Sequence, residues 1–497
     1  MAETQTATVG TTEAADTAGY VEDIADKNDS FSRWYTDVVL RAELADYAPV
    51  RGCMVIRPYG YTLWEHVRDY LDARIKGSGC VNAYFPLLIP KSFLEKEAEH
   101  VAGFAPEVAW VTKGGNDELV EPLAIRPTSE AIIGYMYAKW IHSYRDLPLL
   151  INQWANVMRW EKVTRLFLRT AEFLWQEGHT VHSSYDEAQA RTMEMLEVYR
   201  AFAETDLAVP VVAGRKSEAE KFAGADRTYS IEALMGDGKA LQAGTSHNLA
   251  DHFAKGFDIT FLDRDGATKH AFTTSWGLST RIIGAIIMVH GDEQGLILPP
   301  KVAPFQVVFV PIWRKETERE EVFATIRRLE DGLRHAGVRV KVDWSEHTTP
   351  GFKFNEWELR GVPLRIEVGP RDVKEGKAVL VRRDNRAKAA VAQDELVPQV
   401  QALLLEIQQG MYNKAVRYRA EHTYWVTDYA DFQARIEDRG FFEAWWCGMA
   451  ACEARVKADT KATIRCIPLD QSAHTGGGPC LVCGMASTEW VLYARAY

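Results

Sequence analysis

The order of strands and helices in this 497-residue chain changes near residue 301, and this change limits the possible folds. Residues 31–302 read as strands with helices interspersed at irregular intervals, which favours an antiparallel sheet of the α+β kind. Residues 303–405 alternate strand and helix, which is typical of a separate α/β domain. Residues 406–497 begin with a helix and hold most of the cysteines, and we expect a third, small α+β domain there.

Local signals predict individual elements of the first domain. Thr62 and Glu65 have the spacing of a capping box, and apolar side chains follow at helical intervals as far as Gly77. Residues 81–90 are predicted to form one strand. Further predictions are a helix from Thr128 to about Tyr144, extended segments at 149–161 and 173–179, and a helix at 185–205.

Charge and composition limit the classes of function. The formal charge is −11, so the chain as a whole is not a general binder of nucleic acid. Residues 1–30 hold seven acids and one lysine, which predicts a disordered acidic tail. No apolar run approaches the roughly 20 residues that a membrane span needs, and the first residues lack the pattern of a signal peptide. We therefore expect a cytoplasmic protein without a membrane partner.

One segment has the opposite charge. Residues 360–388 contain nine Lys or Arg residues and four acids. A basic region in an acidic protein is a place where a polyanion can bind. A solvated basic face without a ligand is the alternative, and charge alone favours it.

Five of the seven cysteines lie between Cys447 and Cys483. Cys447 and Cys452 form one close pair, and Cys480 and Cys483 form another. Two such pairs suit a tetrahedral zinc ion with four thiolate ligands, and Cys466 is left over. A cluster of reduced thiols in a small core is the alternative, whereas a disulfide framework is not indicated.

Two sequence-distant arginines point to an anionic substrate with spread charge. Arg159-Trp-Glu161 is followed, after a loop, by Arg169-Thr-Ala-Glu-Phe173, and Gly277-Leu-Ser-Thr-Arg281 opens an apolar helix. Arg can bind pairs of phosphate oxygens, and an aromatic ring can stack on a base. Neither a lysine-bearing phosphate loop nor a dinucleotide glycine fingerprint is present. For each fragment alone, a surface ion pair is the favoured interpretation.

In this order, the fragments resemble motifs 2 and 3 of class II aminoacyl-tRNA synthetases. Residues 82–90, with the helix before them, resemble motif 1, which makes the dimer interface in that class and implies a homodimer. Longer stretches resemble the prolyl-tRNA synthetase family, in its archaeal and eukaryotic-like branch, over about residues 31–497. These stretches are Arg126-Pro-Thr-Ser-Glu130, Glu172-Phe-Leu-Trp-Gln-Glu-Gly-His179, Ala243-Gly-Thr-Ser-His247 and Thr274-Ser-Trp-Gly-Leu-Ser-Thr-Arg281.

The resemblance implies a class II catalytic domain at 31–302, an anticodon-binding domain at 303–405 and a zinc-binding domain at 406–497. It also implies roles for single residues. Proline would be bound by Thr128, Glu130, Arg159, Trp175, Glu177, His179 and His247. ATP would be bound by Arg159, Glu161, Phe173, Gln242, Thr245, Ser279 and Arg281, with Mg²⁺ near Gln242. Arg159 and Arg281 would be catalytic; Lys353, Glu358, Arg365 and Arg371 would read the anticodon; structural zinc would be held by Cys447, Cys452, Cys480 and Cys483.

The implied reaction attaches L-proline to tRNA(Pro) through a prolyl-adenylate and releases diphosphate and AMP. Attack of a carboxylate on the α-phosphorus of ATP requires positioning and positive charge rather than a covalent nucleophile. Residues 182–273, between motifs 2 and 3, are too few for the editing insertion of bacterial-type relatives. We therefore expect no editing domain in this chain, and we expect misactivation of alanine or cysteine.

Three other interpretations fit less well. A class II synthetase for threonine would need zinc ligands in its catalytic core, where this chain has only Cys53 and Cys80. An inactive synthetase-like paralogue is expected to lack the ATP-binding arginines, but Arg159 and Arg281 are both present. A plain zinc-bearing nucleic-acid-binding protein leaves residues 31–300 unexplained.

Overall fold

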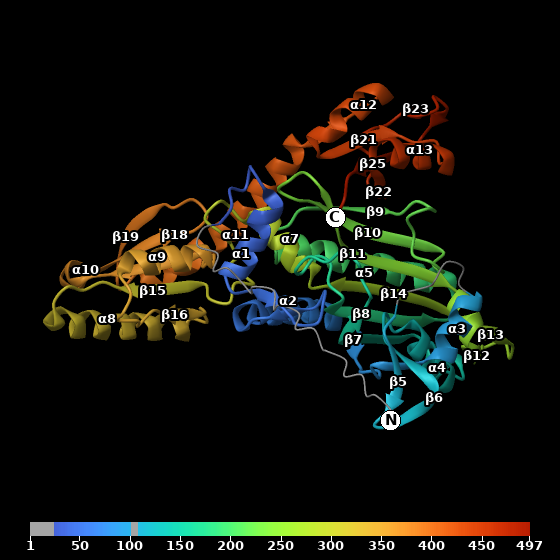
Figure 1. The fold of residues 1–497 in the computed structure, drawn as a ribbon, viewed down its shortest axis with the longest axis horizontal. Helices are drawn as coiled ribbons and strands as arrows, with labels where there is room; N and C mark the ends of the chain where they lie inside the picture. The colour runs from blue at the N-terminus through green and yellow to red at the C-terminus, as the bar shows by residue number, and fades with distance from the viewer. Residues whose placement is uncertain (1–23, 101–107) are drawn as a thin grey trace, which may run out of the picture.

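The structure, a computed structural model, describes residues 24–100 and 108–497, so most of the predicted acidic tail lies outside the described residues. The described end of that segment contacts the folded chain. Lys27 donates to the carbonyl of Gly291 at 2.5 Å, and its ammonium lies over the ring of Trp34. Figure 1 shows a large sheet at the centre, an α/β part on one side of it and a small part that contains the last strands.

The central sheet has eleven strands in the described residues, in the order β20-β21-β25-β22-β9-β10-β11-β14-β8-β7-β3. Every pairing from β9 to β7 is antiparallel, which confirms the predicted α+β class of this part. The strands of this stretch are β7 (Leu149–Met158), β8 (Glu172–His182), β9 (Val211–Arg215), β10 (Arg227–Leu234), β11 (Ala240–Ala250) and β14 (Phe272–Ser279).

Two helices pack on this sheet because their sequences supply apolar faces. In α5 (Tyr185–Thr205), the hydroxyl of Ser184 accepts from the backbone N–H of Glu187 and caps the first turn. This helix packs on β11 and β14 and buries Met195, Tyr199 and Phe202. Helix α7 (Arg281–His290) is apolar all round, and nearly all of its side chains are buried.

Two local predictions about residues 58–90 were wrong. Helix α2 (Pro58–Gly77) begins one turn before the expected capping box, with proline in its first turn, and the hydroxyl of Thr62 donates to the carbonyl of Pro58 at 3.0 Å. Residues 81–90 form two short strands in different sheets. β3 (Val81–Asn82) pairs with β7, whereas β4 (Leu88–Pro90) pairs with β6 (Asp117–Ile125).

The α/β part contains a five-stranded mixed sheet in the order β16-β15-β17-β18-β19. β15 is parallel to both of its neighbours, whereas β17, β18 and β19 are antiparallel to one another. Its elements are β15 (Val307–Pro311), α8 (Glu316–His335), β16 (Val340–Val342), α9 (Pro350–Leu359), β17 (Leu364–Val368), α10 (Pro370–Glu375), β18 (Lys377–Arg382) and β19 (Lys388–Ala392).

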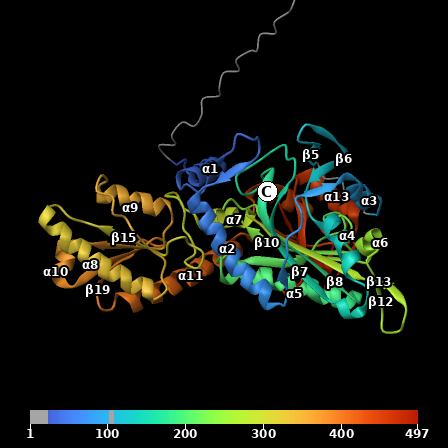
Figure 2. The same ribbon diagram turned by 90° about the horizontal axis from the view of Figure 1, so that it is seen from below.

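Helix α11 (Leu396–Glu421) runs without a break from the α/β part to the last part, so the expected boundary at residue 405 falls inside a helix (Figures 1 and 2). The last part then joins the central sheet. β22 pairs with β25 on one side and with β9 on the other, where Ile467 lies opposite Arg215. Its elements are β20 (Thr423–Trp425), α12 (Tyr429–Arg435), β21 (Phe441–Trp445), α13 (Ala450–Thr460), β22 (Thr463–Pro468), β23 (Gly478–Pro479), β24 (Ala486–Ser487) and β25 (Trp490–Ala494).

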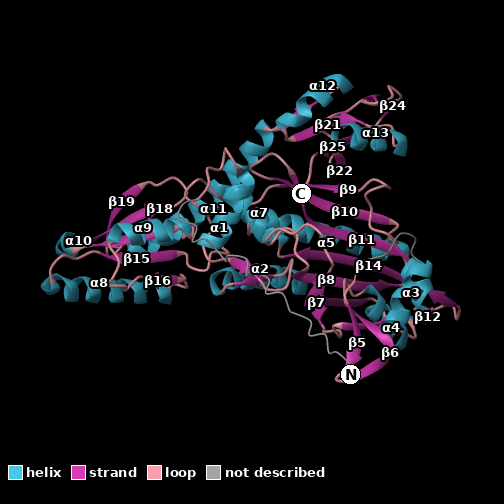
Figure 3. Ribbon diagram, in the orientation of Figure 1, coloured by secondary structure: helices cyan, strands magenta, loops and turns pink. Residues whose placement is uncertain are grey.

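The other elements flank the central sheet, and Figure 3 distinguishes its strands from the surrounding helices. Among the described helices, none is both long and apolar enough to span a bilayer. The flanking elements are α1 (Phe31–Arg41), β1 (Ala45–Tyr47), β2 (Met54–Ile56), α3 (Lys91–His100), β5 (Trp110–Gly114), α4 (Glu130–Trp140), α6 (His252–Phe257), β12 (Thr260–Leu262) and β13 (Thr268–His270).

Candidate active site

A cavity of about 260 Å³ lies on the antiparallel sheet. β8 and β14 supply much of its floor, with Trp175 opposite Ser279 and Glu177 opposite Gly277. Because alternate residues of a strand point to the same face, Phe173, Trp175, Glu177 and His179 all reach the cavity. It brings together all but one of the residues predicted to bind proline or ATP: Thr128, Glu130, Arg159, Phe173, Trp175, Glu177, His179, Gln242, Thr245, His247, Ser279 and Arg281.

Glu161 is the exception. It is absent from the cavity lining, and its carboxylate lies 3.6 Å from the guanidinium of Arg169. In this conformation, Glu161 acts on the cavity only through its charge.

One end of the cavity contains two buried carboxylates. Glu177 accepts from Ser129 Oγ at 2.5 Å and from Gln153 Nε2 at 2.8 Å, and its other oxygen lies 3.0 Å from His179 Nε2. Burial opposes ionisation of Glu177, but the hydrogen bonds, that from His179 first, lower its pKa. Burial likewise opposes protonation of His179, yet Glu177 raises the pKa of the imidazole. Glu130, the second carboxylate, accepts from the hydroxyl of Thr128.

The other end carries the two arginines. Arg159 Nε donates to the carbonyl of Pro127 and Arg281 Nε donates to that of Leu168, each at 3.0 Å. Desolvation lowers the pKa of both guanidinium groups, and repulsion from Arg159 helps to bring the pKa of Arg281 to about 10. In the described part of the chain, the terminal nitrogens of both have no hydrogen-bonding partner, so each can bind an anion there.

His247 lies between two hydroxyls and an aromatic ring. Its Nδ1 is 3.0 Å from Thr228 Oγ1, its Nε2 is 3.1 Å from Thr245 Oγ1, and the ring of Phe222 lies at 4.8 Å. Burial, with repulsion from His179, lowers the pKa of His247 to about 3. His247 is therefore neutral at physiological pH.

Sequence motifs missed one wall of the cavity. Glu220, Phe222 and Thr228, which belong to or follow the β9–β10 connection, line it, and so does Trp276 from β14. The connection has no motif that could have identified it. Trp276 lies inside the stretch Thr274–Arg281 that carried the family resemblance, which was the signal for it. Its ring packs on Gly178, where an added Cβ would lie 2.1 Å from the ring, so a glycine is needed there.

The four predicted anticodon residues are not brought together. Arg365 and Glu358 line a second cavity of about 190 Å³ in the α/β part, together with Arg386 and Lys388. Lys353 is 1% exposed, and its ammonium donates to the carbonyls of Asp343 and Ser345. Arg371 lies apart on α10, exposed and paired with Glu375 at 2.7 Å.

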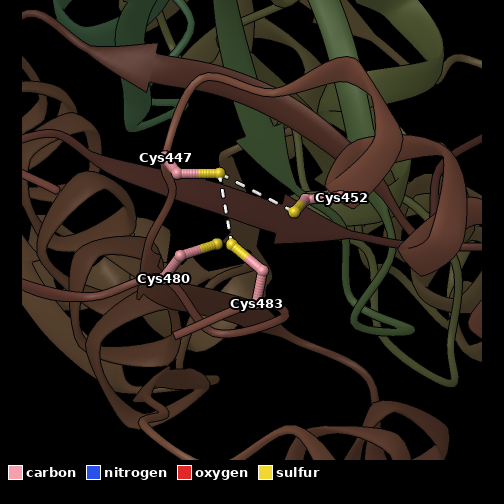
Figure 4. Close-up of side chains that lie close together, drawn as sticks. All are labelled: Cys447, Cys452, Cys480 and Cys483. Carbon is pink, nitrogen blue, oxygen red and sulfur yellow. Dashed lines mark hydrogen bonds between the residues drawn. The ribbon is translucent and has the colours of Figure 1, made fainter. Parts of the chain in front are cut away.

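The four cysteine side chains converge from two segments, as Figure 4 shows. Cys447 Sγ lies 3.7 Å from Cys452 Sγ and 3.6 Å from Cys483 Sγ. A tetrahedral zinc site with bonds of about 2.3 Å has sulfurs about 3.8 Å apart, so the spacing fits. Burial opposes ionisation of Cys480, but backbone N–H groups, that of Cys483 first, lower its pKa to about 7.

Comparison with known proteins identifies each part. Residues 110–290 match the family model of the class II tRNA synthetase core domain (G, H, P, S and T), and residues 306–403 match an anticodon binding domain. Residues 429–497 match the C-terminal domain of prolyl-tRNA synthetase. The fold and the cavity are therefore those of a class II aminoacyl-tRNA synthetase.

The relatives narrow this class. The chain is 56% identical to the proline–tRNA ligase of Natranaerobius thermophilus and 57% identical to that of Symbiobacterium thermophilum, over 96% of this chain and 99% of each relative. It is also similar to a crystal structure of prolyl-tRNA synthetase from Cryptosporidium parvum with halofuginone and AMPPNP, with a TM-score of 0.92, 43% identity, and coverage of 96% of this chain and 98% of that one. The chain belongs to the prolyl-tRNA synthetase family.

Proposed function

We propose that this chain activates L-proline with ATP in the cavity on the antiparallel sheet and transfers the prolyl group to tRNA(Pro). The observation that carries the proposal is the convergence of two arginines, from the end of β7 and the start of α7, on a cavity whose opposite end holds Glu130 and Glu177. An amino acid is an ammonium joined to a carboxylate. The negative end of the cavity can therefore bind the ammonium of an amino acid, and the positive end can bind its carboxylate.

At the proline end, Glu130 and the Thr128 hydroxyl bind the secondary ammonium. His179 and Ser129 fix the position of Glu177, which supplies a second negative charge. The ring of Trp175 is the apolar wall for the pyrrolidine. His247, neutral and hydrogen-bonded, supports the pocket without adding charge near the ammonium.

At the ATP end, Arg159 and Arg281 bind the phosphates and stabilise negative charge that develops as the proline carboxylate attacks. Phe173 stacks on the adenine, with Thr245 and Ser279 beside the nucleotide. Gln242 offers an amide oxygen to the cavity, a ligand type that suits Mg²⁺, and the ion supplies charge neutralisation at the phosphates. Glu161, whose carboxylate lies 3.6 Å from Arg169 in this conformation, joins the ATP site when its side chain turns toward the nucleotide.

Amino-acid-dependent ATP–pyrophosphate exchange tests this proposal. We expect strong exchange with proline and weak exchange with alanine and cysteine, because a small apolar pocket discriminates poorly by size. The chain has no editing domain in this proposal, so charged alanyl-tRNA(Pro) persists when this protein is the only one present. Strong exchange with another amino acid, and none with proline, would contradict the assignment.

The second cavity is proposed to bind the anticodon. Guanine edges accept from Arg and Lys, and Arg365, Arg386 and Lys388 supply such donors there, with Glu358 as an acceptor. Lys353 can take part only after it leaves its two backbone carbonyls. Arg371, which is exposed on α10, is suited to a phosphate contact rather than to a base.

A homodimer is proposed from the surface around residues 47–88. Large apolar side chains are exposed there, including Val81 at 61% and Tyr84 at 70%. Such a patch is typical of an interaction surface. Sedimentation velocity should give a dimer, and Tyr84→Asp should shift the species toward the monomer; a wild-type monomer at micromolar concentration would contradict it.

We also propose that the four cysteines hold a structural zinc ion, and elemental analysis should find one zinc per chain. The proposed location of the protein is the cytoplasm.

The proposed domains are residues 31–302, 303–405 and 406–497, and helix α11 crosses the last boundary. The similarity over nearly full length to the enzyme of the eukaryote Cryptosporidium parvum supports the archaeal and eukaryotic-like branch, although the high-identity relatives named above are bacterial.

A further inference from the structure

The missed wall of the active-site cavity belongs to the segment between β9 and β10. Glu220 and Phe222 reach the cavity from this segment, and Thr228 reaches it from the start of β10. Phe222 lies against His247, with ring centroids 4.8 Å apart, and its backbone N–H donates to Thr228 Oγ1 at 2.9 Å. The position of residues 217–222 therefore sets the width of the cavity beside His247.

Helix α13, from the last part of the chain, holds this segment at two points. Glu453 Oε1 accepts from Ser217 Oγ at 2.6 Å, and both side chains are buried, at 5% and 1% exposed. Lys457 Nζ, one turn further along α13, lies 3.2 Å from Glu220 Oε1. The two contacts join residues more than 230 positions apart in the sequence.

The start of the segment is fixed independently. Lys216 Nζ donates to Glu232 at 2.7 Å and to the carbonyl of Arg465 at 2.6 Å. At the other end, Thr228 is already part of β10. Between these ends, the side chains of Ser217 and Glu220 contact α13 in the described part of the chain, so α13 helps to set where they lie.

We propose that Glu453 and Lys457 are positioning residues for the proline pocket, so that α13 sets the affinity of the catalytic cavity for proline. The inference rests on the proposed assignment of that end of the cavity to proline. The ATP end is unaffected, because Arg281, Ser279 and Thr245 are held by α7, β14 and β11 and not by this segment. Loss of the α13 contacts therefore weakens proline binding selectively.

Steady-state ATP–pyrophosphate exchange tests the selectivity in the full-length protein. For Glu453→Ala, and separately for Lys457→Met, we expect KM for proline to rise, by about tenfold for Glu453→Ala because a buried charged hydrogen-bond acceptor is lost. KM for ATP and kcat at saturating proline should stay within about twofold of wild type. Glu453→Gln keeps an oxygen that accepts from Ser217 and should restore most of the affinity.

Arg455→Ala is the matched control, since Arg455 is an exposed residue of the same helix, 3.6 Å from Asp459. It should leave both KM values unchanged. An unchanged KM for proline in both Glu453→Ala and Lys457→Met would overturn the proposal. So would an equal rise in KM for proline and ATP, which indicates general loss of structure. Wild-type protein without proline-dependent exchange would instead contradict the proposed function.

Hydrogen–deuterium exchange gives a readout that does not depend on activity. Cys452 immediately precedes Glu453, so a metal bound by the four cysteines fixes the start of α13. We expect faster exchange of the 217–222 amides in Glu453→Ala, and in wild-type protein treated with a zinc chelator, than in the untreated protein. Unchanged exchange of this peptide in both samples would contradict the positioning role.

Discussion

The molecule contains two clusters of cationic and acidic side chains that differ in their contacts. At the junction of the central sheet with the last part, Glu232 is 0% exposed and accepts from Lys216, Ser230 and Arg465. The remaining terminal nitrogen of Arg465 donates to Thr463. In the active-site cavity, Arg159 and Arg281 each donate one hydrogen bond from Nε, and their terminal nitrogens face open space.

The difference shows how a structural cluster can be told from a binding cluster. Burying charge is costly unless the charged groups are paired and hydrogen-bonded, and in the junction cluster Lys216 Nζ and all three nitrogens of the Arg465 guanidinium donate to protein oxygens. The cavity cluster has donors without protein partners, which is consistent with a site that an anionic ligand completes. Changes in the first cluster should therefore alter stability, and changes in the second should alter catalysis.

The largest expected effect is on stability. Glu232→Ala leaves Lys216 and Arg465 buried without their carboxylate, which should cost about 3–5 kcal/mol and lower the thermal midpoint by on the order of 10 °C. Differential scanning calorimetry measures the change. Glu218→Ala is the control, because within residues 24–100 and 108–497 that exposed carboxylate pairs only with Lys221. If the thermal midpoint of Glu232→Ala lay within about 2 °C of wild type, as expected for the Glu218→Ala control, the distinction between the two clusters would be lost.

Arg159→Ala should show the opposite pattern. The exchange rate with proline should fall by about 10² to 10³-fold, or roughly 3–4 kcal/mol, because a donor to the developing charge is lost. The thermal midpoint should hardly change, since the guanidinium has only one hydrogen bond to the residues that the structure describes. Arg159→Lys keeps the positive charge but not the paired donors of the guanidinium, so its exchange rate should lie between those of wild type and Arg159→Ala. Near-wild-type exchange by the alanine variant would rule out the catalytic role.

Arg365→Ala extends the comparison to the second cavity. Arg365 pairs with Glu367 at 2.9 Å, but it also lines open space. We expect kcat/KM for charging of tRNA(Pro) to fall by an amount equivalent to about 1–3 kcal/mol of transition-state stabilisation. The rate of proline-dependent exchange should not change. Arg371→Ala, on the exposed helix α10, should have a smaller effect. Equal losses in charging and exchange would mean that Arg365 acts on the fold.

The smallest expected effect concerns pH. The pKa of His247 is lowered to about 3 from its ordinary 6.5, so as the pH falls the unfolded chain binds this proton before the folded one does. Its contribution to stability is full above pH 6.5 and declines by about 1 kcal/mol between pH 6.5 and 5.5. Wild type should lose about 3 °C more in thermal midpoint over this range than His247→Gln. If the thermal midpoints of wild type and His247→Gln fell equally between pH 6.5 and 5.5, this role of His247 would be contradicted.

Local sequence signals predicted some elements closely. Helix α5 was expected at 185–205 and is found there, because Ser184 caps its first turn and Ala188, Met195 and Tyr199 keep helical spacing. The predicted capping box at Thr62 was wrong because helix α2 begins one turn earlier, at Pro58. The prediction of one strand at 81–90 was wrong because β3 pairs with β7 in one sheet and β4 pairs with β6 in another. A local sequence pattern does not show which strands will pair in the folded chain.

The site was predictable where motifs lie on strands. Residues 173–179 alternate into the cavity because β8 is regular. Phe222 and Glu220 were not predicted, because their places in the cavity depend on an irregular segment and, for Glu220, on a contact with the distant Lys457. Lys353 was predicted to read the anticodon, but no signal in the sequence showed that its ammonium donates to the carbonyls of Asp343 and Ser345 in this conformation.

The pairing of β25 has a consequence for how the chain is made. β25 lies between β21 and β22, although it follows both in the sequence. During synthesis, β21 and β22 leave the ribosome before the strand that joins them, while β9 and β10 are already available. The arrangement β21-β25-β22 therefore closes late, although β22 can pair with β9 earlier. Until β25 is in place, the facing edges of β21 and β22 are open to wrong partners.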